Sequence, residues 1–296
     1  ISGKIVCPGF VDAWSAFAVD PNASYDERVG PMTAALDAVD PFIDARFERA
    51  LLAAGITTYR VQPSAIGRSA GLGALLRLNP DRDLKQTTLL ADCCLAFALG
   101  ISRARPLDLF DRVADVDRIV SELSDGLSYL TDTNEYKHEL AAWEKKIAEK
   151  QKELDDGFKK AKKDREKAQT DAKDKGTEFK DKEYKEDKKP KAPRFDEEKE
   201  MLARVASGEL PLVVEVHRAL EIRNLLQGTA KFERLRLVLA GGTEACACAE
   251  ELKARHVPVI VWPQPLAARA QVDEFEHADL SLAGELEEAG VEVILG

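Results

Sequence analysis

Glu215 and His217 are the residues of this sequence whose types and spacing best suit chemistry, in the stretch LPLVVEVHRALEI. The run 210–216 is apolar without polar alternation, which predicts a buried strand. Residues two apart on a strand point to the same side. A carboxylate and an imidazole placed this way can bind a divalent metal or exchange a proton. The commoner arrangement is a strand-end histidine hydrogen-bonded in a polar pocket, because a metal site needs three or four ligands.

The second half of the chain alternates between predicted strands and helices around this pair. The predicted strands are 210–216, 235–240, 257–262 and 291–296, and the predicted helices are 217–228, 243–255 and 280–290. Apolar strands of this kind indicate a parallel sheet that is buried on both faces. Regular alternation over this length favours a TIM-like (β/α) barrel, complete or incomplete, over an open α/β sheet.

The first half carries the same kind of unit. Asp40 and Pro41 suit the start of a helix, and Gly55 suits its end. The β-branched run 56–62 then predicts a strand. Before this unit, the apolar run 5–14 predicts a turn followed by a buried strand.

A charged segment separates the two halves. Residues 151–190 contain 14 basic and 12 acidic side chains, with few apolar ones. We expect residues 135–190 to form a solvated helical or disordered insertion, since no apolar heptad persists long enough for a coiled coil. The predicted organisation is a first barrel part at 1–134, this insertion, and a second barrel part at 191–296.

Composition excludes some classes of partner. The chain outside 151–190 holds 29 basic and 41 acidic residues, which argues against nucleic acid and against an anionic membrane surface. No apolar run is long enough to predict a membrane span. Five cysteines, an odd number, favour a reducing compartment such as the cytoplasm. The first residues read as the middle of a longer chain, so a truncated N-terminus is expected. The sequence is compatible with a homo-oligomer.

Five stretches in order resemble the amidohydrolase superfamily, in particular its imidazolonepropionase-like branch. These stretches are GKIVCPGFVDAWSA, FERALLAAGITTYRVQPS, LPLVVEVHRALEI, LRLVLAGGTEA and VEVILG. The resemblance implies a TIM-like barrel with a divalent metal (zinc, iron or manganese) at the carboxyl ends of its strands. Such a metal polarises an amide carbonyl and activates a water molecule. The implied activity is hydrolysis of a non-peptide C–N bond.

The same resemblance implies that ligand positions are degenerate. Trp14 and Ala16 stand where the family has two histidines, and Gly241 stands where it has another. None of these side chains offers a lone pair to a metal. Ala96 aligns with a family lysine that can bridge two metals. The family also has an aspartate after its last strand, and this sequence ends at Gly296.

The remaining candidates are Asp12, Glu215, His217 and Glu244. The resemblance gives Asp12, His217 and Glu244 catalytic positions and makes Glu215 and His217 the metal candidates. Simpler roles also exist: Asp12 can order the end of its strand, and Glu244 can complement a helix N-terminus. If the alignment is correct, Trp14, His217 and Gly241 should converge on one site.

Three hypotheses follow. The favoured one is a barrel without a cofactor that has lost its metal site and binds a small-molecule ligand or a protein partner. The alternative is an active metal-dependent hydrolase of a cyclic amide that uses Asp12, Glu215 and His217. A metal-free hydrolase ranks last, since nothing positions a nucleophile.

Two other features of the sequence indicate structural roles. The stretch Gly67–Leu76 resembles the family's glycine-rich loop over the barrel mouth, and Cys93 and Cys94 are expected in the apolar core.

Overall fold

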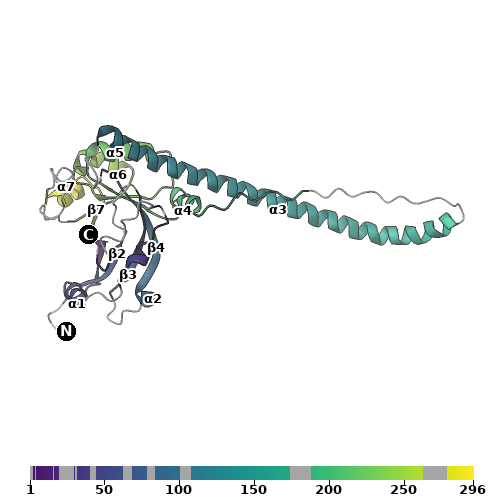
Figure 1. Ribbon diagram of the computed structural model, residues 1–296, viewed down its shortest axis with the longest axis horizontal. Coiled ribbons are helices and arrows are strands. Elements are labelled where there is room, and N and C mark those ends of the chain that lie inside the picture. The colour runs from purple at the N-terminus through teal and green to yellow at the C-terminus, as the bar shows by residue number, and fades with distance from the viewer. Residues whose placement is uncertain are drawn as a thin grey trace. The chain divides into compact units, whose positions relative to one another are not determined.

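The structure is a computed structural model of the chain (Figure 1). It describes residues 3, 5–15, 17–19, 30, 32–40, 45–62, 69–78, 84–100, 108–173, 188–262 and 279–296, without the side chains of 45, 69, 70 and 153–173. The chain divides into two compact units, one formed by residues 1–128 and 196–296 and the other by residues 129–195.

The first unit is built on a sheet whose strand order follows the sequence. Its described strands are β1 (Phe10–Ser15), β2 (Ile56–Val61), β3 (Ser69–Arg77), β4 (Thr88–Ala98), β5 (Leu212–Val216), β6 (Leu237–Gly241), β7 (Val259–Val261) and β8 (Val293–Leu295). The sheet nearly closes, because Gly296 after β8 packs against Trp14 of β1. The predicted TIM-like α/β barrel is therefore confirmed.

Helices follow the strands in the order expected for this fold. The described helices are η1 (Ala35–Ala38), α1 (Ala45–Ala53), α2 (Leu84–Thr87), α3 (Leu109–Lys173), α4 (Glu197–Ala206), α5 (Ala219–Thr229), η2 (Ala245–Cys248), α6 (Ala249–Ala254) and α7 (Leu282–Glu288). The predicted helix–strand units around β2 and β5–β8 are confirmed, with parallel pairing from β4 to β8. The N-terminal start predicted for α1 at Pro41 lies outside the described residues.

Strand β3 is the exception to parallel pairing. It runs antiparallel to both β2 and β4. The prediction of a glycine-rich loop across Gly67–Leu76 is wrong for residues 69–76, which belong to this strand; residues 67 and 68 lie outside the described part. The physical reason is the alternation of side chains along a strand. Leu72, Ala74 and Leu76 share one face of β3, and their exposed fractions are 4%, 0% and 0%.

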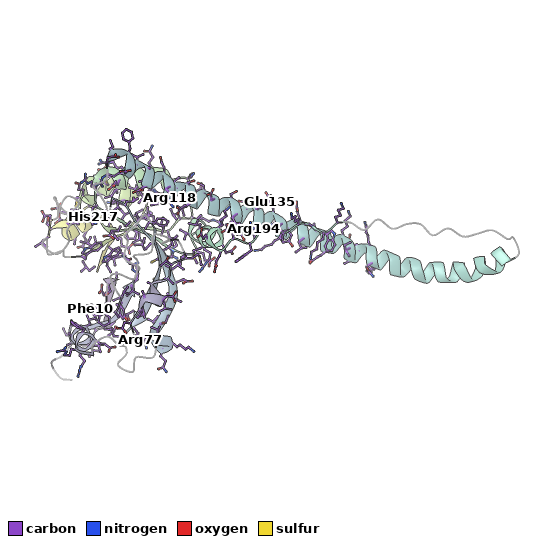
Figure 2. All side chains as sticks on the ribbon, viewed as in Figure 1. Phe10, Arg77, Arg118, Glu135, Arg194 and His217 are labelled. Carbon is purple, nitrogen blue, oxygen red and sulfur yellow. The ribbon has the colours of Figure 1, made fainter. Side chains whose placement is uncertain are left out.

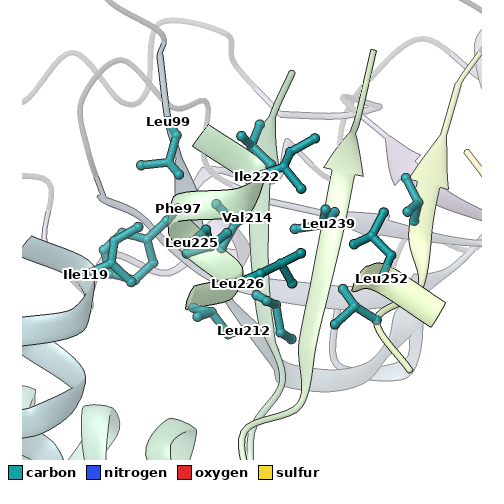
Figure 3. Packing of buried hydrophobic residues seen from close by; sticks show 14 of the residues in the cluster. Phe97, Leu99, Ile119, Leu212, Val214, Ile222, Leu225, Leu226, Leu239 and Leu252 are labelled. Carbon is teal, nitrogen blue, oxygen red and sulfur yellow. The ribbon is translucent and has the colours of Figure 1, made fainter. Parts of the chain in front are cut away.

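Two apolar layers form on either side of β5 and β6. Leu212, Val214 and Leu239 point outward and pack with Ile222 and Leu225 of α5 (Figure 3). The first turns of α3 join the same core through Val116, Ile119 and Leu123. The residues between those on β5, β6 and β7 point inward, and Val213, Ala240 and Ile260 form a separate cluster there. Strand periodicity thus divides an outer core from a barrel interior.

The second unit consists of the later part of α3 and the segment that follows it. Near Trp143 the described segment 188–195 returns alongside the helix, and the Lys189 ammonium lies 6.0 Å from the centre of the Trp143 ring. This distance suits a cation–π contact, which is worth less than about 1 kcal/mol at exposed sites.

Among helices in the described ranges, none combines the length and the apolar character required to cross a bilayer.

A buried ion pair connects α3 and α5 within the first unit. Arg112 donates from Nη1 to Glu221 Oε1 at 3.0 Å, and the two side chains are 10% and 2% exposed. Gly100 makes room for this pair: its φ is +74°, and a Cβ there would lie 2.7 Å from Arg112 Nη1. The backbone after β4 therefore requires glycine at this position.

We predict that Arg112→Met lowers the free energy of unfolding by about 3 to 5 kcal/mol, because it leaves the Glu221 carboxylate charged and buried. Urea denaturation followed by circular dichroism measures this change. Arg118→Met is the matched control, since Arg118 pairs with Glu122 on the exposed face of the same helix and its loss should cost under about 0.5 kcal/mol. Equal losses in the two variants would contradict the role of the buried pair.

Candidate functional site

Strand β5 places Glu215 and His217 on the same inward face, as strand alternation requires. Both side chains are buried, at 5% and 1% exposure. Glu215 Oε1 lies 3.7 Å from His217 Nε2, which is longer than a hydrogen bond but close enough for attraction if the imidazole is protonated. His217 is labelled in Figure 2.

The end of β6 fixes the His217 ring. His217 Nδ1 and Thr243 Oγ1 are 2.7 Å apart, a hydrogen bond whose direction depends on the tautomer. Gly241 has φ +87°, and a Cβ on it would lie 2.3 Å from His217 Cε1. The imidazole therefore occupies the space that any side chain at position 241 would need.

Two tryptophans lie beside this histidine. Trp14 of β1 stacks on Trp262, which follows β7, with ring centres 4.5 Å apart and planes 8° apart. The Trp262 ring also makes an edge contact with His217: the two ring centres are 6.3 Å apart and the planes meet at 87°. We call Trp14, Trp262 and His217 the aromatic cluster. It joins side chains from β1, β5 and the end of β7 and brings Trp14, His217 and Gly241 to one place.

Arg60 of β2 also contacts the ring of Trp14. Its guanidinium carbon lies 5.2 Å from the centre of the Trp14 ring, within cation–π range. Its Nε donates to the Ala13 carbonyl oxygen at 2.7 Å. Sequence reasoning missed the role of Arg60 and did not single out Trp262. The available signal was strand alternation, which puts Trp262 on the same face as Ile260.

Asp12 and Glu244 each bind backbone. Asp12 Oδ1 accepts a hydrogen bond from the Trp14 amide at 3.0 Å, which orders the end of β1. Glu244 Oε2 accepts from the amide of Ala219, the first residue of α5, at 2.8 Å. The helix N-terminus that Glu244 contacts is that of α5, which precedes it in the chain. There it offsets the positive end of the helix dipole.

The other aligned positions are placed as follows. Ala96 is buried in β4 and pairs with Val213 of β5. Ala16 lies outside the described residues. In the part of the chain that the structure describes, no group of three or more His, Cys, Asp and Glu side chains is arranged to hold a metal ion.

Polar atoms at the same ends of β2 and β7 are buried without partners. Within the described ranges, Arg60 Nη2, Gln62 Oε1 and Trp262 Nε1 make no hydrogen bond. Leaving such an atom unsatisfied costs about 1 to 3 kcal/mol. Two of the three atoms are donors and one is an acceptor.

Comparison with known proteins supports the fold. No protein-family model matches the chain, and no curated protein matches it. Among solved structures, it is similar to an amidohydrolase from Thermotoga maritima MSB8, with a TM-score of 0.61 and 22% sequence identity. The likeness covers 98% of this chain and 65% of that one, so this chain spans about two thirds of its length. The chain therefore has a barrel fold of the type found in that amidohydrolase.

We predict that Gly241→Ala destabilises the protein by about 2 to 4 kcal/mol, because alanine is strained at this φ and its Cβ collides with the His217 ring. Thermal and urea denaturation measure the loss. Gly284→Ala in α7 is the control: a Cβ there meets nothing within 4 Å, so helix propensity should leave stability unchanged or raise it by up to about 1 kcal/mol. A Gly241 variant as stable as the control would show that His217 does not need this space.

Proposed function

We propose that this protein is a catalytically silent barrel of the amidohydrolase type that binds a small ligand without hydrolysing it. The observation that carries the proposal is the aromatic cluster. Trp14 and Trp262 stack their indole rings at the strand ends, and the His217 ring meets Trp262 in an edge contact. Indole nitrogen donates a hydrogen bond but offers no lone pair to a metal.

The described residues do not fit a metal centre of the kind the resemblance implies. A zinc site takes three or four protein donors with short bonds. Here Asp12 and Glu244 hold backbone amides, which leaves Glu215 and His217 as the donors that face each other. The His217 ring is also held by Thr243 and by the surface of Gly241. Turning it toward a metal would break this packing.

The buried polar atoms support a cyclic amide as the ligand. Arg60 Nη2 and Trp262 Nε1 need acceptors, and Gln62 Oε1 needs a donor. A cyclic amide presents a carbonyl oxygen and an N–H group on one planar ring, and its faces can stack on indole. The protein would thus keep the recognition of an amide while lacking the means to cleave it.

We expect the protein, purified without chelator, to contain far less than one zinc, iron or manganese ion per chain by elemental analysis. Added zinc should leave the melting temperature unchanged, because a metal that binds only the folded state would raise it. Both measurements are made on the Cys7→Ser variant, because Cys7 is an exposed free thiol that can capture zinc nonspecifically.

The alternative, an active metal-dependent hydrolase, gives the opposite result. It requires near-stoichiometric metal that disappears in both His217→Ala and Glu215→Gln, together with ring opening of a cyclic amide. That pair of findings would reject the silent barrel.

For ligand binding we propose hydantoin, a cyclic amide, as the probe. Trp143→Phe leaves only Trp14 and Trp262 to fluoresce, so their emission reports on the aromatic cluster. We expect hydantoin to change this emission saturably while remaining chemically intact. Trp262→Phe on that background keeps an aromatic ring but removes the indole N–H, and it should weaken binding roughly tenfold, the worth of one buried hydrogen bond. Identical titrations for both proteins would contradict the proposed contact.

A further inference from the structure

Two neighbouring cysteines of β4 form a sulfur pair inside the barrel. On a regular strand adjacent side chains point to opposite faces, yet Cys93 Sγ and Cys94 Sγ are 3.9 Å apart. The cause is an irregularity in the pairing of β3 with β4: Gly73 faces Cys94 but Leu75 faces Leu90, so β4 carries extra residues at this point. Such a bulge re-aims a side chain.

The surroundings distinguish the two sulfurs. Arg60 Nη1 donates to Cys94 Sγ at 3.1 Å, and Cys93 Sγ donates to the same atom. Gly73 gives this sulfur its space, because a Cβ there would lie 2.7 Å from Cys94 Sγ. Cys94 is 2% exposed, and Cys93 is half-buried. Cys94 is thus placed to be a thiolate and Cys93 its thiol partner.

Electrostatics agree with this assignment. The hydrogen bond from Cys93 and then the charge of Arg60 lower the pKa of the Cys94 thiol. The hydrogen bond to Cys94 and burial raise the pKa of Cys93. Elsewhere in the chain, burial and the Glu285 carboxylate raise the pKa of Cys246 to about 11. Since the thiolate is the nucleophile, Cys94 should be the more reactive of these thiols once an oxidant reaches it.

We propose that Cys93 and Cys94 form a redox site in which hydrogen peroxide oxidises Cys94 and Cys93 then closes a disulfide with it. This inference is independent of the proposed function. Peroxide is the chosen oxidant because it is small and uncharged and Cys94 is almost fully buried. The oxidation ladder of cysteine begins with such an attack.

The chemistry balances without a further reactant. The Cys94 thiolate attacks one oxygen of peroxide, so an S–O bond forms, the O–O bond breaks and hydroxide leaves. Cys93 sulfur then attacks the sulfenic sulfur: an S–S bond forms, the S–O bond breaks, and the Cys93 proton leaves with the hydroxyl group as water. The two sulfurs together lose two electrons, and peroxide gains them.

The disulfide should be easy to reverse. Adjacent Cα atoms are about 3.8 Å apart, which is shorter than the Cα separation of ordinary disulfides. A bond formed under that constraint is strained and therefore more reducible than a structural disulfide. Oxidation also removes the negative charge that Arg60 contacts, beside the ring of Trp14. The state of the sulfur pair should thus be sensed at the aromatic cluster.

The test treats the reduced, folded protein with limiting hydrogen peroxide near neutral pH and follows each cysteine by peptide mass spectrometry. We expect the peptide with Cys93 and Cys94 to lose two hydrogen atoms at least roughly tenfold faster than Cys246 is oxidised, and dithiothreitol to restore it. Cys93→Ser should stop at a sulfenic acid on Cys94 that reacts with dimedone. Arg60→Met should slow the oxidation, and Arg60→Lys should largely preserve it.

Two controls keep the proposal falsifiable. In urea all five cysteines should react at similar rates, because the folded environment is what separates them. Circular dichroism confirms that each variant is folded, and the comparison with Cys246 is made within the unsubstituted chain, so it does not depend on any variant. Oxidation of Cys94 no faster than that of Cys246, or conversion directly to sulfinic acid with Cys93 still present, would overturn the proposal.

Discussion

The position of one imidazole ring constrains the whole barrel end. His217 packs on the backbone of Gly241, and its ring stands where the side chain of residue 241 would begin. Only glycine permits this packing, and it also satisfies the positive φ at that point. A histidine at 241 and a histidine at 217 in its present position therefore exclude each other. Glycine at position 241 thus lets the His217 ring occupy this place, where it contacts the Trp262 ring.

Two tryptophans give this end of the barrel an aromatic interior. The Trp14 ring contacts both Trp262 and the Arg60 guanidinium, and Gly296, which follows β8, packs against Trp14. These contacts join β1 to β2 and to the residues that follow β7 and β8, so they help to bring the two edges of the sheet together. These side chains thus add apolar contact across the seam of the barrel.

Much of the fold follows from the sequence, because apolar runs and helix-ending glycines are local signals. The units around β2, β5, β6, β7 and β8 were predicted this way. Strand β3 was not, since Gly71 and Gly73 suggest a loop, and only the tertiary contacts of Leu72, Ala74 and Leu76 make it a strand. At the site, spacing alone pairs Glu215 with His217. The contacts of Arg60 with Trp14 and of Trp262 with His217 join residues far apart in the sequence, and no local pattern encodes them.

The long segment between β4 and β5 affects the rate of folding. These strands are hydrogen-bonded neighbours, yet residues 99–211, with all of α3 and α4, separate them along the chain. The entropic cost of closing a loop grows only with the logarithm of its length, by about 0.6 kcal/mol of free energy for each doubling. The long segment therefore lowers the stability of the native sheet only slightly. Folding rate depends more strongly on sequence separation. The antiparallel β2–β3–β4 segment has short connections and can assemble early, whereas joining β4 to β5 must await a search over the full interval, and that step should limit the rate at which the barrel forms.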